Sequence, residues 1–285
     1  MRASNIRGIL ALAVLMFSGC RATPPPPPAY DWTTGETVVK AMFDRYTNRW
    51  FNTLTYVQNN EAYDASGTVT RSVWLSAIRK QDRATDPQQM RIPLPRYQQR
   101  IDFVPLERRE GTFFSRDTQY LVLRGVVSRV MPSVNPLFIL TQEVYSELPS
   151  QTVRRLRAAG INLDYIRQDR WRGRPVWVVG TLSRNLDVPQ FWVDRSDLLL
   201  VRLIDRSGPD GGLVDTQLSQ YQRIGTSWIA RVIETRDGRR LIERQELHQI
   251  TGDQPLDSLL FDPYRWTAGR HWYQQPPGVP QRRGD

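Results

Sequence analysis

Apolar and β-branched residues recur most regularly between residues 164 and 205, where they predict three consecutive β-strands. The first strand is Pro175–Gly180, which follows a turn at residues 172–174. Gln190–Asp194 forms the second strand and Leu198–Ile204 the third. Valine, isoleucine and tryptophan fit a pleated surface well, and short turn segments separate the three strands. This region therefore predicts part of a β-sheet around which the rest of the chain is organised.

The third of these strands is predicted to have one wholly apolar face. Alternate residues of a strand point to the same side, so Leu199, Val201 and Leu203 are expected to share that face. Phe191 and Val193 on the preceding strand extend it. A continuous apolar face must be buried against packed side chains, covering helices or a ligand. These five residues are therefore the candidate lining of a ligand cavity.

Further strands are predicted before and after this region, where short apolar segments lie between glycines and prolines. They are Leu54–Val57, Val69–Ile78, Met90–Leu94, Arg100–Val104, Gly111–Phe114, Gln119–Leu123, Trp228–Thr235 and Arg240–Ile250. Asp237-Gly238 between the last two is a strong hairpin signal. Short strands without intervening helices predict an antiparallel sheet made of meanders.

Helical periodicity is confined to a few segments, so the predicted fold class is mainly β with a few α-helices. Thr33 and Glu36 have the spacing of a capping box at the start of a helix that extends to about Trp50. A second helix is expected from Asn135 to Pro149, with proline at its first position. Ser150 is expected to cap a third helix that ends at Gly160. Its arginines are expected on the solvated face, and they are Arg154, Arg155 and Arg157.

The first twenty residues have the pattern of a lipoprotein signal peptide. Two arginines and an apolar run precede Ser18-Gly19-Cys20, which resembles a lipobox. Cys20 is the only cysteine of the chain and lies where this signal requires one. We therefore expect residues 1–19 to be removed and Cys20 to be the lipid-attachment site. The alternative is an ordinary secretory signal with a chance cysteine.

Composition divides the remaining chain into three parts. Residues 20–33 contain the lipidated cysteine and five consecutive prolines, Pro24–Pro28, which predict an extended linker. Residues 34–273 contain all the predicted strands and helices. Residues 274–285 have the composition of a disordered tail.

The expected anchor determines the compartment. An acylated Cys20 would hold the protein on membrane lipid in a bacterial cell envelope, since each buried methylene contributes about 0.8 kcal/mol. In the sorting rule of enterobacteria, aspartate after the cysteine retains a lipoprotein in the inner membrane. Arg21 occupies that position here. The sequence thus favours the outer membrane, with the protein facing the periplasm.

Charge and composition provide little catalytic chemistry. The formal net charge of +10 comes from arginine, since Lys40 and Lys80 are the only lysines. A basic surface suits anionic headgroups or acidic partners, but an exported lipoprotein is not expected to bind nucleic acid. The chain has two histidines, His248 and His271, and no cysteine besides Cys20. These residues are too few for most catalytic triads and zinc sites. We therefore expect no enzyme, no catalytic residue, no metal and no cofactor.

The central strands also carry a resemblance. Residues 173–180 read GRPVWVVG, and residues 191–194 read FWVD. After a short turn, residues 199–202 read LLVR. This succession resembles the LolA/LolB-like superfamily of outer-membrane lipoprotein-sorting proteins. The resemblance extends from Gly35 to about Tyr273. It implies a strongly curved antiparallel sheet, a half-barrel closed by helices around an apolar cavity that accepts lipid.

Two hypotheses follow for the function. In the first, a lipid-anchored envelope protein binds an acyl chain or a lipidated polypeptide in the half-barrel, as a sorting or carrier protein does. In the second, a regulatory or structural envelope lipoprotein uses the same fold without lipid transfer. The state of the interior, open to a ligand or filled by side chains, distinguishes them.

Overall fold

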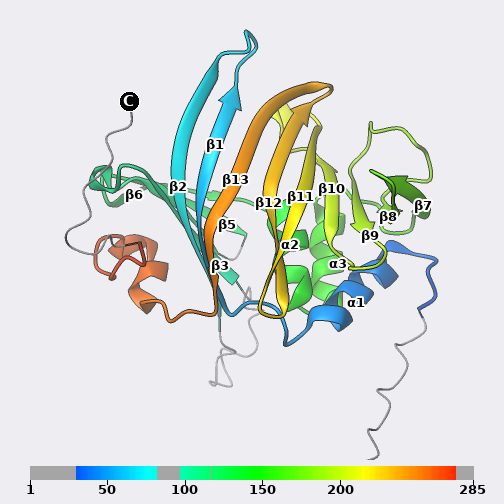
Figure 1. Cartoon of the computed structure of the whole chain (residues 1–285), viewed down its shortest axis with the longest axis horizontal. Helices are drawn as coiled ribbons and strands as arrows, with labels where there is room; N and C mark the ends of the chain where they lie inside the picture. The colour runs from blue at the N-terminus through cyan, green and yellow to red at the C-terminus, as the bar shows by residue number, and fades with distance from the viewer. Residues whose placement is uncertain (1–29, 82–96, 116, 274–285) are drawn as a thin grey trace, which may run out of the picture. The chain divides into compact units, whose positions relative to one another are not determined.

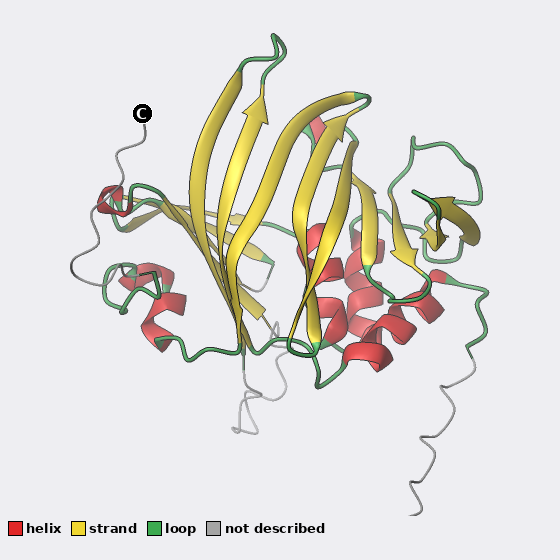
Figure 2. Cartoon of the chain, in the orientation of Figure 1, coloured by secondary structure: helices red, strands yellow, loops and turns green. Residues whose placement is uncertain are grey.

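A curved antiparallel sheet of thirteen strands is the main feature of the computed structural model, which describes residues 30–81, 97–115 and 117–273 (Figure 1, Figure 2). The strands are β1 (Thr53–Tyr63), β2 (Val69–Lys80), β3 (Tyr97–Phe103), β4 (Gly111–Ser115), β5 (Thr118–Leu123), β6 (Val126–Pro132), β7 (Ile166–Trp171), β8 (Arg174–Val179), β9 (Gln190–Asp194), β10 (Leu200–Asp205), β11 (Val214–Ile224), β12 (Ser227–Asp237) and β13 (Arg240–Gly252). The predicted fold class, mainly β with a curved, unclosed antiparallel sheet and a few helices, is confirmed.

The order of the strands shows how the half-barrel is assembled. Along the sheet the order is β6-β5-β4-β3-β2-β1-β13-β12-β11-β10-β9-β8-β7. Two meanders, β1 to β6 and β7 to β13, thus meet where β1 pairs with β13, and Gln58 lies opposite Leu247. Strands β6 and β7 are the two edges of the sheet. The helical segment of residues 136–158 connects one edge to the other.

Three α-helices occur in the described part of the chain, and they cover one face of the sheet, here called the inner face (Figure 2). They are α1 (Gly35–Tyr46), α2 (Pro136–Thr141) and α3 (Pro149–Ala158), with the 3₁₀ helix η3 (Glu143–Tyr145) between the last two. Val38 and Met42 of α1 are fully buried in the main core with Leu54 of β1. The apolar stripe of α1 therefore packs on the sheet, as its periodicity predicts.

The start of α1 differs from the predicted capping box. Thr34, not Thr33, is the N-cap residue, and its side chain makes no capping hydrogen bond. The backbone amide of Gly35 instead donates a hydrogen bond of 2.7 Å to the carbonyl of Leu163. A tertiary contact therefore satisfies a helix-end donor that local sequence was expected to satisfy.

The helical connection is more broken than predicted. The expected helix of residues 135–149 is divided into α2 and η3, although Asn135 does cap α2 by accepting a hydrogen bond of 3.1 Å from the amide of Phe138. Pro149 begins α3 instead of ending the preceding helix, so Ser150 is not its cap. Proline is favourable at the first position of a helix, because the amide missing there has no helical partner.

Three strands were missing from the sequence prediction, namely β6, β7 and β11. Their apolar residues alternate poorly with polar ones, and β6 and β7 are edge strands with mixed exposure. The predicted strand Met90–Leu94, the signal and Cys20, the proline run and the tail of residues 274–285 lie outside the described residues. None of the helices in the described ranges is both long and apolar enough to cross a membrane.

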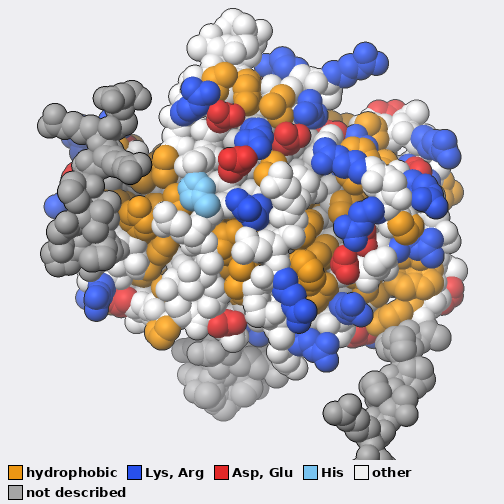
Figure 3. Space-filling model, viewed as in Figure 1, with side chains coloured by type: hydrophobic (Ala, Val, Ile, Leu, Met, Phe, Trp, Pro, Cys, Tyr) orange, Lys and Arg blue, Asp and Glu red, His pale blue; other side chains and the backbone are white. Residues whose placement is uncertain are grey.

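The C-terminal segment packs on the opposite, outer face of the sheet. It contains the short 3₁₀ helices η5 (Ser258–Phe261) and η6 (Pro263–Arg265). Leu260, Phe261 and Trp266 form a second apolar cluster with Phe113 of β4 and Val122 of β5. On the face seen in Figure 3, basic side chains are spread among acidic and apolar ones and do not form one patch.

Candidate functional site

The predicted cavity residues are packed core. Phe191, Val193, Leu199 and Leu203 are each at most 3% exposed and belong to the main core between the sheet and the helices. Val201 belongs to a separate cluster with Val176, Val178 and Trp192. The structure therefore brings four of the five candidates together and places the fifth elsewhere.

A β-bulge explains why Val201 is separated from its neighbours. Leu200 lies opposite Val193, but the next paired residue of β10 is Arg202, opposite Trp192. Val201 is the extra residue, and an extra residue shifts the alternation of the strand. The prediction that Leu199, Val201 and Leu203 share one face is therefore wrong.

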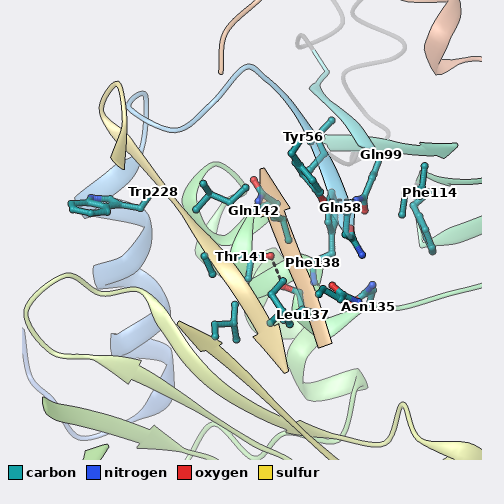
Figure 4. A pocket seen from close by; sticks show the side chains of 18 of the residues that line it. Tyr56, Gln58, Gln99, Phe114, Asn135, Leu137, Phe138, Thr141, Gln142 and Trp228 are labelled. Atoms are coloured by element: carbon teal, nitrogen blue, oxygen red, sulfur yellow. Dashed lines mark hydrogen bonds between the residues drawn. The ribbon is translucent and has the colours of Figure 1, made fainter. Parts of the chain in front are cut away.

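A hollow lies further along the inner face, between the sheet and α2 (Figure 4). It encloses about 900 Å³ of space free of atoms, part of which is open to solvent. Its walls come from β1 to β4, β11 to β13, α2 and η3. The lining residues are Trp50, Tyr56, Gln58, Trp74, Ile78, Gln99, Ile101, Phe114, Asn135, Leu137, Phe138, Thr141, Gln142, Tyr145, Leu218, Tyr221, Trp228, Ile229, Ala230, Ile233, Gln245 and Leu247. This set contains none of the five predicted cavity residues.

Aromatic side chains form one part of the lining of the hollow, here called its aromatic floor. The rings of Trp50 and Tyr145 lie 3.8 Å apart between centroids, and Trp50 Nε1 donates a hydrogen bond of 3.0 Å to Gln142 Oε1. Tyr221 Oη donates to the carbonyl of Leu200 at 2.5 Å. Burial raises the pKa of the Tyr145 hydroxyl well above its ordinary value. These rings are fixed by packing and hydrogen bonds and form a rigid apolar floor.

Amide side chains line the wall formed by β1 and β3. Gln58 Nε2 donates to Asn60 Oδ1 at 2.5 Å, and Gln99 Nε2 donates to Tyr56 Oη at 3.2 Å. Burial raises the pKa of the Tyr56 hydroxyl, which therefore stays neutral. Figure 4 labels Gln58 of β1 and Phe138 of α2 among the side chains around the hollow. Among the described residues that line it, none is charged and none is histidine.

A charged cluster borders this hollow at α3. Arg155 forms ion pairs with Asp117, with Glu143 and, at 3.1 Å, with Glu147. A small neighbouring pocket contains Arg155 and Glu143, and shares Phe138 with the hollow. Burial raises the pKa of Glu143 to about 7, opposed by the attraction of Arg155. Arg155 is thus bound to carboxylates of the protein, contrary to its predicted solvated position.

A second polar cluster lies on the outer face. Arg100 donates two hydrogen bonds of 2.7 Å to the carboxylate of Asp102, and its guanidinium lies 3.7 Å from the centre of the Trp266 ring. His271 Nε2 lies 3.2 Å from Asp102 Oδ2, and its ring stacks on Trp272. This arrangement fixes the C-terminal segment on β3. In the described ranges, no group of three or more potential ligand side chains is placed to hold a metal ion.

The sequence did contain one signal for the hollow. Tyr56, Gln58 and Asn60 alternate along β1, so uncharged polar residues occupy a buried face. Buried amides are uncommon unless hydrogen-bonded, so their presence on a core face marks a site where polar contacts are needed. The other walls depend on the pairing of β1 with β13, which local pattern does not reveal.

Comparison with known proteins identifies the architecture. The sequence matches no protein-family model, and no curated protein matches it significantly. A solved structure described as an outer-membrane lipoprotein-sorting protein domain from Vibrio parahaemolyticus superposes with a TM-score of 0.52 at 11% identity, covering 80% of this chain and 96% of that chain. The chain shares the fold of this domain.

A second structure supports this assignment of the fold. A DUF1329 family protein from Desulfovibrio piger matches with a TM-score of 0.50 at 12% identity, covering 80% of this chain and 95% of that chain. At such low identity, the likeness shows the fold alone. The chemistry of the hollow therefore depends on the residues that line it in this chain.

Proposed function

We propose that this protein is a lipid-anchored envelope protein that holds an acyl chain or a lipidated polypeptide in the hollow between the curved sheet and α2. One observation carries the proposal: a hollow, partly open to solvent, whose described lining is aromatic and aliphatic with a few amide and hydroxyl groups and without a charge. The lipoprotein-sorting fold supports the same conclusion.

Burial of the ligand's acyl chain would supply the binding free energy. About ten buried methylenes would contribute about 8 kcal/mol before the entropy cost of association is subtracted. The aromatic floor around Trp50 and Tyr145 is already packed in the absence of a ligand. Little reorganisation is then needed on binding, and less of the favourable free energy is lost.

Membrane attachment through Cys20 completes the proposal. Two or three acyl chains on this cysteine would hold the protein on the envelope membrane, because two lipid chains are enough for stable anchoring. Arg21, the residue after the cysteine, favours the outer membrane. The test is Cys20→Ala with metabolic palmitate labelling and membrane fractionation. Loss of label and release from the membrane are expected, and full acylation of the variant would contradict the proposal.

Filling the hollow tests the binding function. Ala230 lies in the wall of the hollow and is 5% exposed. The larger side chain of Ala230→Trp would fill the space that the acyl chain is proposed to occupy. The matched control is Ala158→Trp on the exposed surface of α3. Mass spectrometry of co-purified lipid should find acyl compounds with the wild type and the control, and not with Ala230→Trp. Folding of each variant is checked by circular dichroism.

Absence of a bound acyl compound would favour the second hypothesis, a regulatory or structural role. If the folded wild type never carries or binds an acyl compound, the sorting or carrier role is wrong. A regulatory or structural envelope lipoprotein with the same fold would then be the better account.

A further inference from the structure

We infer that the hollow selects acyl compounds with an uncharged head, such as an ester, an amide or a glyceride, and excludes free fatty acids and anionic phospholipids. This inference rests on the proposed function and adds the chemical class of the ligand. Three observations carry it: the neutral lining, the buried amides, and the sign of the charges at the border.

The first observation is the neutral lining. None of its described residues can form an ion pair with a carboxylate or a phosphate. An anion that leaves water without a cationic partner loses its hydration and gains little in return. An ester or amide head loses far less, because it carries no net charge. The lining therefore favours neutral heads.

The second observation is the set of buried amides. Gln58 and Gln99 are 5% and 8% exposed and donate to Asn60 and Tyr56 respectively. A primary amide has two N–H donors, so each of these glutamines has a second donor that these bonds do not use. Such donors match the carbonyl oxygen of an ester or an amide, which is a neutral acceptor.

The third observation is the charge at the border of the hollow. Arg155 is the cation of the neighbouring cluster, and it already contacts the carboxylates of Asp117, Glu143 and Glu147. Three acidic side chains therefore surround one basic side chain next to Phe138, which lines both spaces. This cluster offers an anionic head no available cation and adds repulsion.

The test compares two probes that differ only in the charge of the head. cis-Parinaric acid and its methyl ester have the same fluorescent chain, and at pH 8 only the acid is ionised in water. The protein is the mature chain from residue 20 with Cys20→Ser, which cannot be acylated. We expect the ester to bind at least tenfold more tightly than the acid, and dioleoylglycerol to displace it where phosphatidylglycerol does not.

A charge placed in the lining should change the selectivity. Gln245 on β13 is half-buried in the wall, so Gln245→Arg introduces a cation there. The affinity for the acid should then rise at least tenfold relative to that for the ester. Gln222→Arg adds the same charge at an exposed position of β11 and should leave both affinities unchanged.

The outcomes separate this inference from the proposed function. Equal binding of acid and ester by the wild type, or tighter binding of the acid, would overturn the inference and leave the proposed function standing. Binding of neither probe would overturn both. An equal gain in Gln222→Arg would also contradict the inference, since the selectivity would not arise in the hollow. The wild-type comparison decides the matter even if Gln245→Arg does not fold.

Discussion

Arg155 of α3 forms an ion pair with Asp117, which lies in the turn between β4 and β5. This contact joins the helices to a part of the sheet that is distant in sequence. The same guanidinium contacts Glu143 and Glu147, whose side chains are 3% and 6% exposed. One arginine therefore neutralises buried carboxylates beside the hollow and links three segments of the chain.

Removing this arginine should be costly. Arg155→Gln leaves the buried carboxylates without a cation, and breaking a buried ion pair in this way typically costs about 3–5 kcal/mol of unfolding free energy. Urea denaturation measures the change. Arg157→Gln is the matched control, because Arg157 pairs with Glu36 and Asp164 at an exposed surface, where ion pairs contribute about 0–1 kcal/mol. Equal effects of the two substitutions would contradict the buried role of Arg155.

The raised pKa of Glu143 gives the protein a defined pH dependence. Burial raises this pKa from 4.5 to about 7 in the folded state, so the folded state binds the proton more tightly than the unfolded state does. The contribution of this group to stability is therefore fully present below about pH 4.5 and is lost as the pH rises to about 7.

Glu143→Gln should remove this contribution to the pH dependence. The free energy of unfolding of the wild type, relative to that of the variant, should fall between about pH 4.5 and pH 7. Urea titrations at a series of pH values measure the difference. Glu107→Gln, at an exposed position, is the control and should follow the wild type. A constant difference between wild type and Glu143→Gln over this range would show that Glu143 does not titrate there.

Local pattern predicted the elements whose apolar face is continuous. The strands β8, β9 and β10 and the helix α1 were located from the spacing of their apolar residues, most of which are buried in the main core or in the cluster that contains Val201. The curved half-barrel followed from the resemblance carried by these same strands. Both the pattern and the resemblance concern residues close together in the sequence.

The hollow could not be located in this way. Its walls join Gln58 of β1 to Leu247 of β13 and to Phe138 of α2, and only the pairing of distant strands brings these residues together. The bulge at Val201 likewise leaves no mark in an apolar run where every residue suits a strand. Arg155 was expected in solvent because its carboxylate partners belong to other segments. Long-range pairing therefore limits what a single sequence reveals.

The start of α1 requires glycine. A Cβ atom at Gly35 would lie 2.2 Å from Val179 Cγ1 of β8 and 3.1 Å from the carbonyl oxygen of Leu163. Gly35→Ala should therefore displace α1 from the sheet, and overpacking of this kind costs about 1–3 kcal/mol. Thermal unfolding measures the loss. Glu36→Ala, at the next and exposed position, should have a smaller effect, and a Gly35→Ala variant as stable as the wild type would contradict this close packing.

Trp266 should anchor the C-terminal segment to the outer face of the sheet. It is 3% exposed, lies against the guanidinium of Arg100 and packs with Phe113. Trp266→Ala should cost about 3–5 kcal/mol, since it removes a large buried ring and leaves a cavity. Tyr264→Ala, two residues earlier and 71% exposed, should change stability by about 0.5 kcal/mol or less.

Limited proteolysis distinguishes local release of this segment from global unfolding. If Trp266 holds the segment on β3 and β4, Trp266→Ala should be cleaved after residue 256 at protease concentrations that leave the Tyr264→Ala chain intact, because local opening exposes backbone before the sheet unfolds. The acyl-binding hollow lies on the inner face and should keep its ligand affinity in the folded variant. An unchanged cleavage pattern with reduced ligand binding would show that Trp266 supports the hollow and not the C-terminal segment.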